Sequence, residues 1–344
     1  MPKILVSGGT GYIGSHTVVE LLENGIEVVI VDNLSNSEIE VLDGIKSITG
    51  KEPHFEEVDL KDRKATYGVF EKHPDISAII HFAAYKAVGE SVEKPLDYYE
   101  NNLLSLIHLL EAMNIYQVDH LVFSSSCTIY GEPDSLPVTE DAPIKKATSP
   151  YGNTKQICED ILKDTMKSTE GKGVISLRYF NPIGAHPSAS IGELPLGVPC
   201  NLVPYVTQTA AGIRECLSVY GDDYNTPDGS AIRDYINVVD LALAHVTAIK
   251  RLLHGKQKSS FEVFNLGTGR GLSVFEIIKA FEKASGQKLN YKVVGRREGD
   301  IEKVYADTTF ANDELGWKAE KGIEETLLSA WLWEMNIRAK KSKT

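Results

Sequence analysis

The sequence is poor in cysteine, and its few cysteines are scattered. Cys127, Cys158, Cys200 and Cys216 are the four cysteines among 344 residues, and no two of them have CxxC spacing. Four such thiols are too few for a disulfide scaffold. We therefore expect reduced thiols and a cytoplasmic protein, and we expect no metal site.

Long apolar runs and an excess of positive charge are also missing. No stretch approaches the ~20 apolar residues that cross a bilayer. The first predicted strand begins at residue 3, so we expect no signal peptide either. With 36 Lys and Arg against 48 Asp and Glu, the formal net charge is −12. A chain of this charge is not expected to bind nucleic acid or an anionic membrane.

The composition is that of a globular protein, and the sequence changes character about half-way. Hydrophobic residues make up 42% and charged residues 24%, and the length suggests about two domains. Apolar strands alternate with amphipathic helices up to residue 181, after which prolines and glycines interrupt the pattern. We expect an α/β fold: a Rossmann-type doubly wound parallel sheet in residues 1–181, which also receives parts of 237–266, and a smaller, loop-rich α/β substrate-binding domain, mainly 182–344.

A glycine-rich loop follows the first predicted strand directly. Residues 3–7 (KILVS) read as a short buried strand, and the next seven read GGTGYIG. Gly8 suits a tight turn, Gly11 lets the backbone approach a pyrophosphate, and Gly14 allows close packing of helix and strand. The start of the following helix offers free N–H groups to phosphates. This loop predicts a dinucleotide site.

The acid expected of an NAD site stands at the end of the second strand. A helix is predicted from about residue 15 to 24 and a strand at 27–31, which ends in Asp32. A carboxylate roughly 20 residues after the last glycine meets the adenosine ribose of NAD. A plain βαβ unit without a nucleotide is the alternative reading. Further strands are predicted at 54–58, 76–81, 121–124, 174–179 and 261–266, and helices at 97–117, 151–166 and after Ser273.

Three further residues suggest acid–base chemistry at a hydroxyl group. Tyr151 and Lys155 stand one helical turn apart, and Ser126 closes a strand at the sheet edge where ligands bind. A phenol has a reference pKa of ~10, so a base at pH 7 needs roughly 4 kcal/mol of phenolate stabilisation. The Lys155 ammonium and the positive nicotinamide ring would supply it, while Ser126 would donate or relay a hydrogen bond to the substrate oxygen.

These residues resemble the extended short-chain dehydrogenase/reductase family and, within it, the UDP-glucose (UDP-galactose) 4-epimerases. The similar blocks are GGTGYIGSH (8–16), DNLSNS (32–37), KAVGES (86–91), YYENN (98–102), SSSCTIYG (124–131), SPYG (149–152), LRYFNPIGAH (177–186), RDY (233–235) and RREGD (296–300). The resemblance implies an isomerase that inverts C4 of UDP-galactose and UDP-glucose through a 4-keto intermediate. It also implies that NAD stays bound through turnover.

The resemblance implies a role for each matching residue. Tyr151 would be the acid/base, with Lys155 and Ser126 beside it. The residues implied at NAD are Gly8, Gly11, Tyr12, Ile13, Gly14, Asp32, Asn33, Ser37, Asp59, Leu60, Phe82, Ala83, Lys86, Asn101, Ser124, Tyr151, Lys155 and Tyr179. Those implied at the UDP-sugar are Lys86, Ser126, Thr128, Tyr151, Tyr179, Phe180, Asn181, Asn201, Leu202, Tyr220, Arg233, Tyr235, Arg297, Asp300 and Val304.

The two arginines of this set have an independent physical argument and also a plainer alternative. A guanidinium fork matches phosphate oxygens bidentately, which suits Arg233 and Arg297 to a diphosphate. Each could instead form a surface ion pair with its neighbour, Asp234 or Glu298. The sequence alone leaves both possibilities open.

Other positions are ambiguous or depart from the family pattern. Lys86 would otherwise be a solvated loop charge, and Asp59 a turn-capping acid. Cys127 stands where relatives often have alanine and is expected to pack, whereas Cys200 replaces a frequent asparagine near the uridine. Val304 is smaller than the aromatic residue of restrictive relatives, so we expect slow conversion of UDP-N-acetylgalactosamine as well.

Two other functions fit part of the pattern. A sugar-nucleotide 4,6-dehydratase also oxidises C4, but related dehydratases have an Asp-Glu pair where this chain has Cys127 and Thr128. A non-catalytic NAD-binding regulator tends to lose the catalytic residues, which are intact here. The resemblance further implies a homodimer through the helices predicted at 97–117 and 151–166.

Overall fold

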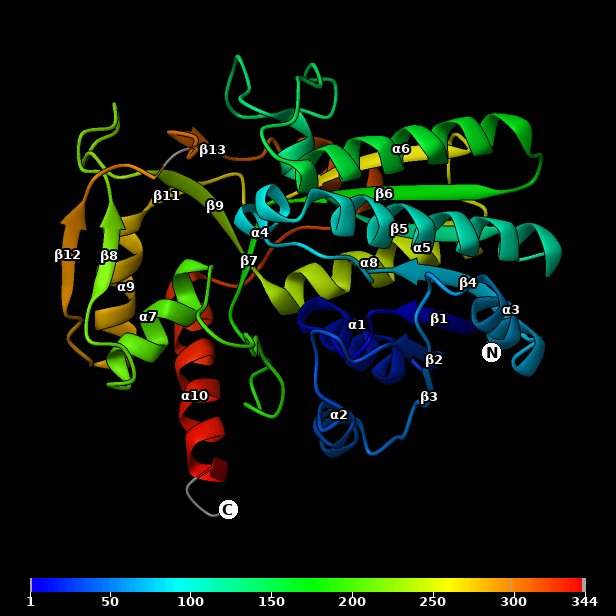
Figure 1. The fold of residues 1–344 in the computed structure, drawn as a ribbon, viewed down its shortest axis with the longest axis horizontal. Helices are drawn as coiled ribbons and strands as arrows, with labels where there is room; N and C mark the ends of the chain where they lie inside the picture. Colours follow the sequence, from blue (N-terminus) through cyan, green and yellow to red (C-terminus); the bar gives the residue numbers. More distant parts are fainter. Residues whose placement is uncertain (1, 298, 342–344) are drawn as a thin grey trace.

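The computed structural model describes residues 2–297 and 299–341 (Figure 1). Its helices are α1 Tyr12–Glu23, α2 Val41–Thr49, α3 Arg63–Lys72, α4 Val88–Glu93, α5 Pro95–Ile115, α6 Pro150–Ser168, α7 Leu202–Ala210, α8 Val238–Leu253, α9 Val274–Ser285 and α10 Ile323–Lys341, with the short η1 Cys127–Tyr130 and η2 Ala311–Leu315. Its strands are β1 Lys3–Ser7, β2 Glu27–Asp32, β3 His54–Glu57, β4 Ile76–His81, β5 His120–Ser126, β6 Gly173–Tyr179, β7 Asn181–Ile183, β8 Leu217–Tyr220, β9 Ile232–Asn237, β10 Phe261–Leu266, β11 Gly271–Ser273, β12 Tyr291–Val294 and β13 Lys303–Val304.

The larger sheet is parallel and confirms the expected Rossmann-type fold. Its seven strands run in the order β10-β6-β5-β4-β1-β2-β3. The strand order reverses between β1 and β4, and ligands of such sheets bind outside the carboxyl ends of the strands at this switch point. The loops that follow β1, β4 and β5 all begin at this edge. The fold thus positions the glycine-rich loop and the serine-ended strand at one place.

Helices cover both faces of this sheet because side chains alternate along each buried strand. On β1, Ile4 and Val6 pack toward α1 and α8, whereas Leu5 packs toward α3, α5 and α6. Helix α8 and strand β10 come from beyond residue 181 and still belong to this layer.

A smaller part of the chain lies beside the carboxyl edge of the large sheet. It contains the short sheet of β7, β9, β11 and β13 and the two-stranded sheet of β8 and β12. Helices α7, α9 and α10 enclose its own apolar core. In Figure 1 this part is at the left, and α10 descends from it toward the carboxyl end.

Two predicted helices begin earlier than expected. Helix α1 starts at Tyr12 because Gly11 takes an extended N-cap conformation, which puts Gly14 inside the first turn. Glycine is a poor helix former, so the sequence favoured a later start. Helix α5 starts at Pro95, which suits the first turn of a helix. Within residues 2–297 and 299–341, no helix is long and apolar enough to cross a membrane.

Candidate functional site

A cavity of ≈ 970 Å³ opens at the carboxyl edge of the large sheet. Every residue that the sequence analysis expects at the cofactor, from Gly8 to Tyr179, lines it. Its opposite wall comes from residues 192–201 of the smaller part. Its volume falls in the range of cofactor and ligand pockets.

The glycine-rich loop has the tight geometry that a dinucleotide needs. Gly8 has a φ of +71°, and a Cβ there would lie 2.8 Å from the Ala83 nitrogen. A Cβ on Gly14 would lie 2.1 Å from the Gly8 carbonyl oxygen, so the start of α1 packs directly on the loop. Among the described residues, no side chain caps the N-terminus of α1 at Gly11. This end of the helix can therefore receive phosphate oxygens, and the loop fits NAD.

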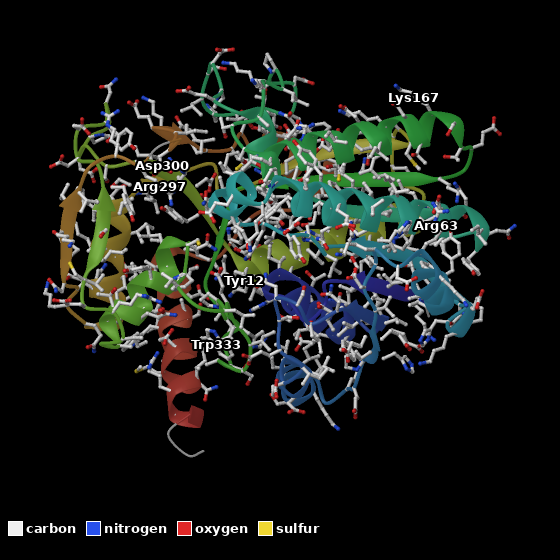
Figure 2. All side chains as sticks on the ribbon, in the orientation of Figure 1. Tyr12, Arg63, Lys167, Arg297, Asp300 and Trp333 are labelled. Carbon is white, nitrogen blue, oxygen red and sulfur yellow. The ribbon has the colours of Figure 1, made fainter. Side chains whose placement is uncertain are left out.

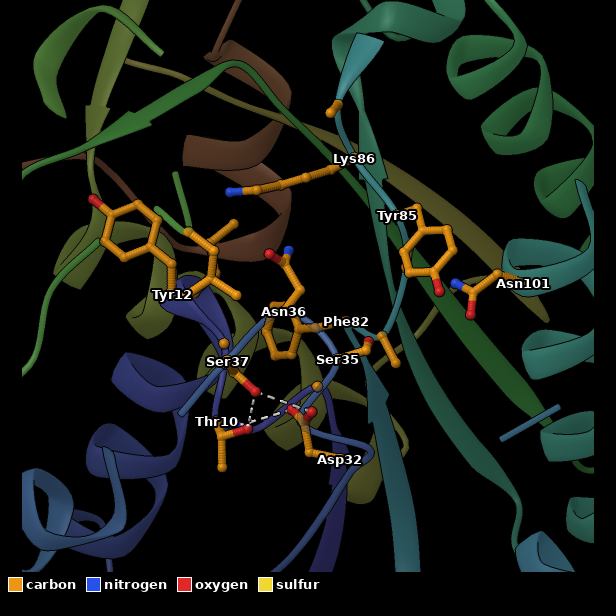
Figure 3. A pocket seen from close by; sticks show the side chains of 18 of the residues that line it. Thr10, Tyr12, Asp32, Ser35, Asn36, Ser37, Phe82, Tyr85, Lys86 and Asn101 are labelled. Carbon is orange, nitrogen blue, oxygen red and sulfur yellow. Dashed lines mark hydrogen bonds between the residues drawn. The ribbon is translucent and has the colours of Figure 1, made fainter. Parts of the chain in front are cut away.

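Asp32 lies at the end of β2 and is held by the loop residues around it. Its carboxylate accepts hydrogen bonds from the Thr10 nitrogen at 3.3 Å, the Leu34 nitrogen at 3.0 Å and the Ser37 hydroxyl at 3.2 Å. Thr10 and Ser37 also share a hydrogen bond of 2.7 Å, so the three side chains form a compact group (Figure 3). A fixed carboxylate at this position favours ribose hydroxyls and disfavours a phosphate.

On the opposite side of the cavity, Lys86 meets a carboxylate that the sequence analysis did not single out. Lys86 Nζ lies 3.6 Å from Glu193 Oε1 and 5.9 Å from the centre of the Tyr12 ring, toward which it points in Figure 3. Glu193 also accepts a hydrogen bond of 2.7 Å from Asn201 Nδ2. The half-exposed Lys86 side chain is thus paired with a residue of the opposite wall. No local motif marks Glu193, because its partners are distant in sequence.

Asp59 has the turn-capping role considered for it and lies at the cavity. Its carboxylate accepts a hydrogen bond of 2.9 Å from the Lys61 nitrogen, which makes it a turn-capping acid. It also lines the cavity together with Leu60. The structure therefore leaves a contact with the cofactor open to it.

Tyr151 and Lys155 face the sheet from the first turns of α6. The helix begins at Pro150, after Ser149 accepts a hydrogen bond of 3.1 Å from the Gly152 nitrogen. Such an N-cap fixes where the helix starts, and therefore which side chains face β5. Tyr151 is 7% exposed and Lys155 is 4% exposed.

Burial favours the neutral form of both side chains and therefore shifts their pKa values in opposite directions. Burial raises the pKa of the Tyr151 phenol well above its usual value, and Tyr179 adds to this, whereas a hydrogen bond with Ser126 opposes it. Burial lowers the pKa of Lys155 to about 8. Lys155 Nζ donates to the Ser124 carbonyl oxygen at 2.7 Å. The phenol is therefore neutral at pH 7 and needs additional positive charge nearby to act as a base.

Ser126 ends β5 at the entrance to η1. Its Oγ accepts hydrogen bonds from the Thr128 nitrogen at 3.2 Å and from the Thr128 hydroxyl at 3.0 Å. The neighbouring Ser124 and Tyr179 hydroxyls lie 2.6 Å apart. Together with the Tyr151 phenol, these groups form a buried set of hydroxyls able to transfer protons to and from a substrate alcohol.

Most residues expected at the substrate are not part of the cavity lining. Lys86, Tyr151, Tyr179 and Asn201 line it. The described residues of its lining do not include Ser126, Thr128, Phe180, Asn181, Leu202, Tyr220, Arg233, Tyr235, Arg297, Asp300 or Val304. Ser126 is the register partner of Tyr179, which lines the cavity. Asn181 pairs with Tyr235, and Arg233 pairs with Val304.

The two arginines converge on one carboxylate. Arg297 Nη2 lies 2.7 Å from Asp300 Oδ1, and Arg233 Nη2 lies 3.8 Å from the same oxygen. The Arg297 guanidinium also lies 5.6 Å from the centre of the Tyr220 ring. Figure 2 shows Arg297 and Asp300 close together in the smaller part of the molecule. This arrangement pairs two positive groups with one negative group beside an exposed aromatic ring.

The alternative ion pair of Arg233 with Asp234 is not found in the part of the chain that the structure describes, because Asp234 is engaged elsewhere. Asp234 is fully buried and accepts hydrogen bonds from the Thr268 nitrogen and hydroxyl, at 2.8 and 2.7 Å, and from the Ala306 nitrogen at 3.2 Å. Arg233 pairs with Asp300 instead. Glu298, the alternative partner of Arg297, lies outside the described residues.

Val304 and the two unusual cysteines have different surroundings. Val304 is 6% exposed and packs with Ile129 and Phe180. Burial raises the pKa of Cys127 to about 12, so this thiol is a packing residue rather than a nucleophile. Cys200 is exposed and lines the cavity.

Comparison with known proteins finds one family model and many similar sequences that cover nearly the whole chain. The family model described as GDP-mannose 4,6 dehydratase matches residues 5–329. A UDP-glucose 4-epimerase of Bacillus subtilis is 53% identical over 340 residues, 98% of this chain and 99% of that protein. Its counterpart from Drosophila melanogaster is 52% identical over 97% of this chain and 96% of that protein.

Solved structures agree with the sequence relatives. A UDP-glucose 4-epimerase from Stenotrophomonas maltophila, with bound NAD and formylated UDP-arabinopyranose, has a TM-score of 0.95 and 45% identity over 99% of this chain and 100% of that one. The enzyme from Bifidobacterium longum, in complex with NAD+ and UDP, has a TM-score of 0.93 and 46% identity over 97% and 98% of the two chains.

Proposed function

The chain belongs to the UDP-glucose 4-epimerases, within the family described by the GDP-mannose 4,6 dehydratase model, and uses NAD to interconvert UDP-galactose and UDP-glucose; we propose that Tyr151, Lys155 and Ser126 carry out this reaction. The observation that carries the assignment of residues is the buried contact of the Tyr151 phenol with Ser126, one helical turn from the Lys155 ammonium. Tyr151 and Lys155 line the cavity into which the glycine-rich loop fits NAD, and Ser126 ends β5 beside them.

Each of the three residues has a separate task. Bound NAD supplies a positive ring and the ability to accept and return the hydride of the sugar carbon. The Tyr151 phenolate takes the proton of the 4-hydroxyl and later returns it. Lys155 stabilises that phenolate by its charge, and Ser126 holds the sugar oxygen by a hydrogen bond. These tasks require the pKa of the Tyr151 phenol to fall from its raised value. The positive charges of Lys155 and of the NAD ring both lower that pKa, because they stabilise the phenolate.

We also propose how the substrate is held while its sugar rotates between the two hydride transfers. Inversion at C4 requires the sugar to present both faces to the same site, so the anchor must be distant from the reacting carbon. Arg233 and Arg297 suit the diphosphate, since both guanidinium groups already gather around one anionic carboxylate, Asp300. Asp300 would then bind the uridine ribose, and Tyr220 would lie beside the nucleotide.

The cofactor residues follow from the cavity lining. Asp32 would accept the adenosine ribose hydroxyls, the loop from Gly8 to Gly14 would hold the pyrophosphate, and Lys86 would approach from the opposite wall. We keep the division into an NAD-binding domain, residues 1–181 with α8 and β10, and a UDP-sugar-binding domain, mainly 182–344, as a proposal. Expression of residues 1–181 alone should not give an NAD-binding protein, because α8 covers one face of the sheet.

A 4,6-dehydratase activity is less well supported. Cys127, with a pKa of about 12, and Thr128 follow Ser126, and neither is an acid able to assist loss of the C6 hydroxyl. Incubation with UDP-glucose and analysis of the products separates the two functions. An epimerase yields UDP-galactose, whereas a dehydratase yields a 4-keto-6-deoxy sugar nucleotide and water.

We further propose a homodimer and a cytoplasmic location. Helices α5 and α6 lie against each other, joined by a hydrogen bond of 2.7 Å from Asn153 Nδ2 to the Tyr99 hydroxyl. Leu103 on α5 and Ile161 on α6 are only partly buried by the chain itself, which leaves apolar surface for a partner copy. Light scattering at micromolar concentration should report twice the chain mass, and a monomer would contradict the proposal. The scattered free thiols favour the cytoplasm, which cell fractionation tests.

A further inference from the structure

The carboxylate of Glu159 is the centre of a buried hydrogen-bond network behind the active site. Its Oε1 accepts from the Ser125 hydroxyl at 2.7 Å, the Ser176 hydroxyl at 2.8 Å and Arg178 Nε at 3.0 Å. Its Oε2 accepts from Arg178 Nη2 at 2.6 Å. All four side chains are at most 3% exposed. So many donors on one buried carboxylate keep it charged and fix its position.

The charge state of Glu159 follows from these contacts. Burial alone would raise its pKa, but Arg178 and the two serine hydroxyls hold the pKa below its usual value. Arg178 in turn has the carboxylate as its counter-ion. Lys163 Nζ, partly exposed on the same helix, lies 3.9 Å from Oε2 as well. Neutralising Glu159 would leave the Arg178 guanidinium as a buried charge without its counter-ion.

The network joins every element that carries a proposed catalytic residue. Glu159 lies on α6, one turn after Lys155 and two turns after Tyr151. Ser125 is on β5, directly before Ser126, and it is the register partner of Arg178 on β6. In Figure 1, α6 runs along β6 and β5. The contact between Glu159 and Ser125 therefore sets how far α6 is advanced along β5.

Arg178 extends the network to the segment after Ser126. Its Nη1 donates to the Tyr130 hydroxyl at 2.8 Å, and that hydroxyl donates to Asn265 Oδ1 at 2.7 Å. Tyr130 closes η1, whose first residue follows Ser126. The network thus holds both sides of Ser126.

We propose that Glu159 is a positioning residue of the epimerase reaction: by binding Ser125 and Arg178 it keeps Tyr151 and Lys155 of α6 in register with Ser126 of β5. This inference rests on the proposed function of these three residues and adds a fourth, which does not touch the substrate. Displacement of a catalytic group by about 1 Å can cost roughly 100-fold in rate. A small slip of α6 along β5 would therefore reduce turnover without a change in substrate binding.

The pH profile should report this register. The hydrogen bond from Ser126 lowers the pKa of the Tyr151 phenol. If Ser126 moves away, that pKa rises, and the acid limb of the kcat profile moves to higher pH because a base must lose its proton to act. The other titratable groups that act on Tyr151 are Tyr98 on α5, Cys127 on η1 and Tyr179 on β6, and Lys155 follows it by one turn on α6. None of them is changed by the substitutions below.

Two serines provide a matched pair for the test. Ser125 and Ser176 are both fully buried, and both donate to the same Glu159 oxygen at nearly equal distances. Ser125 adjoins Ser126, whereas Ser176 lies in the middle of β6. Ser125→Ala and Ser176→Ala should therefore lose similar stability. Only Ser125→Ala should lower kcat, by roughly 10-fold, while its KM for UDP-galactose stays within about threefold of the wild-type value. The acid limb of its kcat profile should also move to higher pH.

A second pair tests the carboxylate itself. Glu159→Gln removes one of the two acceptor oxygens of the Arg178 fork, and Glu262→Gln does the same to Arg251, whose Nε and Nη2 lie 2.7 and 2.9 Å from Glu262 on β10. Glu159→Gln should lower kcat by at least roughly 10-fold, and Glu262→Gln should leave kcat within about twofold. If Glu159→Gln does not fold, the serine pair decides alone.

The outcomes are distinct. The proposal is supported if Ser125→Ala alone shows the kcat loss and the displaced limb. It is overturned if the two serine variants have equal kcat and equal pH profiles. Tyr151→Phe, measured beside them, separates this failure from that of the proposed function, because an active Tyr151→Phe variant would contradict the catalytic assignment itself.

Discussion

Replacing Tyr151 by phenylalanine removes one oxygen atom from the proposed catalytic group and almost nothing else. The ring of Tyr151 is 7% exposed, so its packing is kept. The lost hydroxyl has a hydrogen bond with Ser126, which retains its contacts with Thr128. A hydrogen bond of this kind contributes about 1 kcal/mol. For a chain of this length that corresponds to a change in melting temperature of at most about 2 °C.

The effect on the rate should be far larger than the effect on stability. Loss of a positioned acid/base costs typically 10²–10⁴-fold, or about 3–5 kcal/mol of activation free energy. We therefore expect Tyr151→Phe to purify with its NAD and to melt near the wild-type temperature. Its kcat for UDP-galactose, followed by a coupled assay for UDP-glucose, should fall by at least about 100-fold.

The comparison of rate and stability makes this prediction refutable. A Tyr151→Phe variant with more than about half of the wild-type rate would show that another group moves the proton. A large loss of melting temperature or of bound NAD would instead show a structural role for the hydroxyl. Either result would contradict the reasoning from burial and hydrogen bonding.

Three further predictions concern the cofactor and the sugar. NADP should reconstitute the apo-enzyme at least roughly tenfold less well than NAD, because its 2′-phosphate would face Asp32; equal reconstitution would contradict that geometry. Gly14→Ala should lose bound NAD, since its Cβ would lie 2.1 Å from the Gly8 carbonyl oxygen. Gly68→Ala, where a Cβ meets nothing within 4 Å, should retain NAD, and the absorbance of the bound cofactor in each purified variant measures the difference. We expect the wild type to convert UDP-N-acetylgalactosamine more slowly than UDP-galactose and Val304→Tyr to lose the N-acetyl activity selectively; an unchanged ratio of the two rates would show that Val304 is not the gate.

The sequence predicted the parts of the fold that depend on local patterns. Strand β10 and helix α9 begin where expected, because an apolar run and a Ser273 capping box mark them. The residues expected at the cofactor all line the cavity, and many of them stand at strand ends or in loops that directly follow strands. In such a sheet, the position of a residue at a strand end already determines its place at the ligand edge.

Contacts between distant segments were not predictable in the same way. The wall formed by residues 192–201 and the contact of Glu193 with Lys86 depend on how the smaller part folds back over the sheet. The Glu159 network likewise joins residues from α6, β5 and β6. Nothing in the spacing of a glutamate and two serines indicates that they share one oxygen atom. Such polar partners become visible only when the register of the strands is known.

The most direct test of the account uses the purified enzyme and no added cofactor. The protein is freed of loose nucleotide by gel filtration and incubated with UDP-galactose, and the products are separated by chromatography. We predict that UDP-glucose forms over many turnovers without added NAD, because the bound cofactor is regenerated in each cycle. Failure to form UDP-glucose from an enzyme that demonstrably contains NAD, or a reaction that stops after one equivalent, would contradict the account.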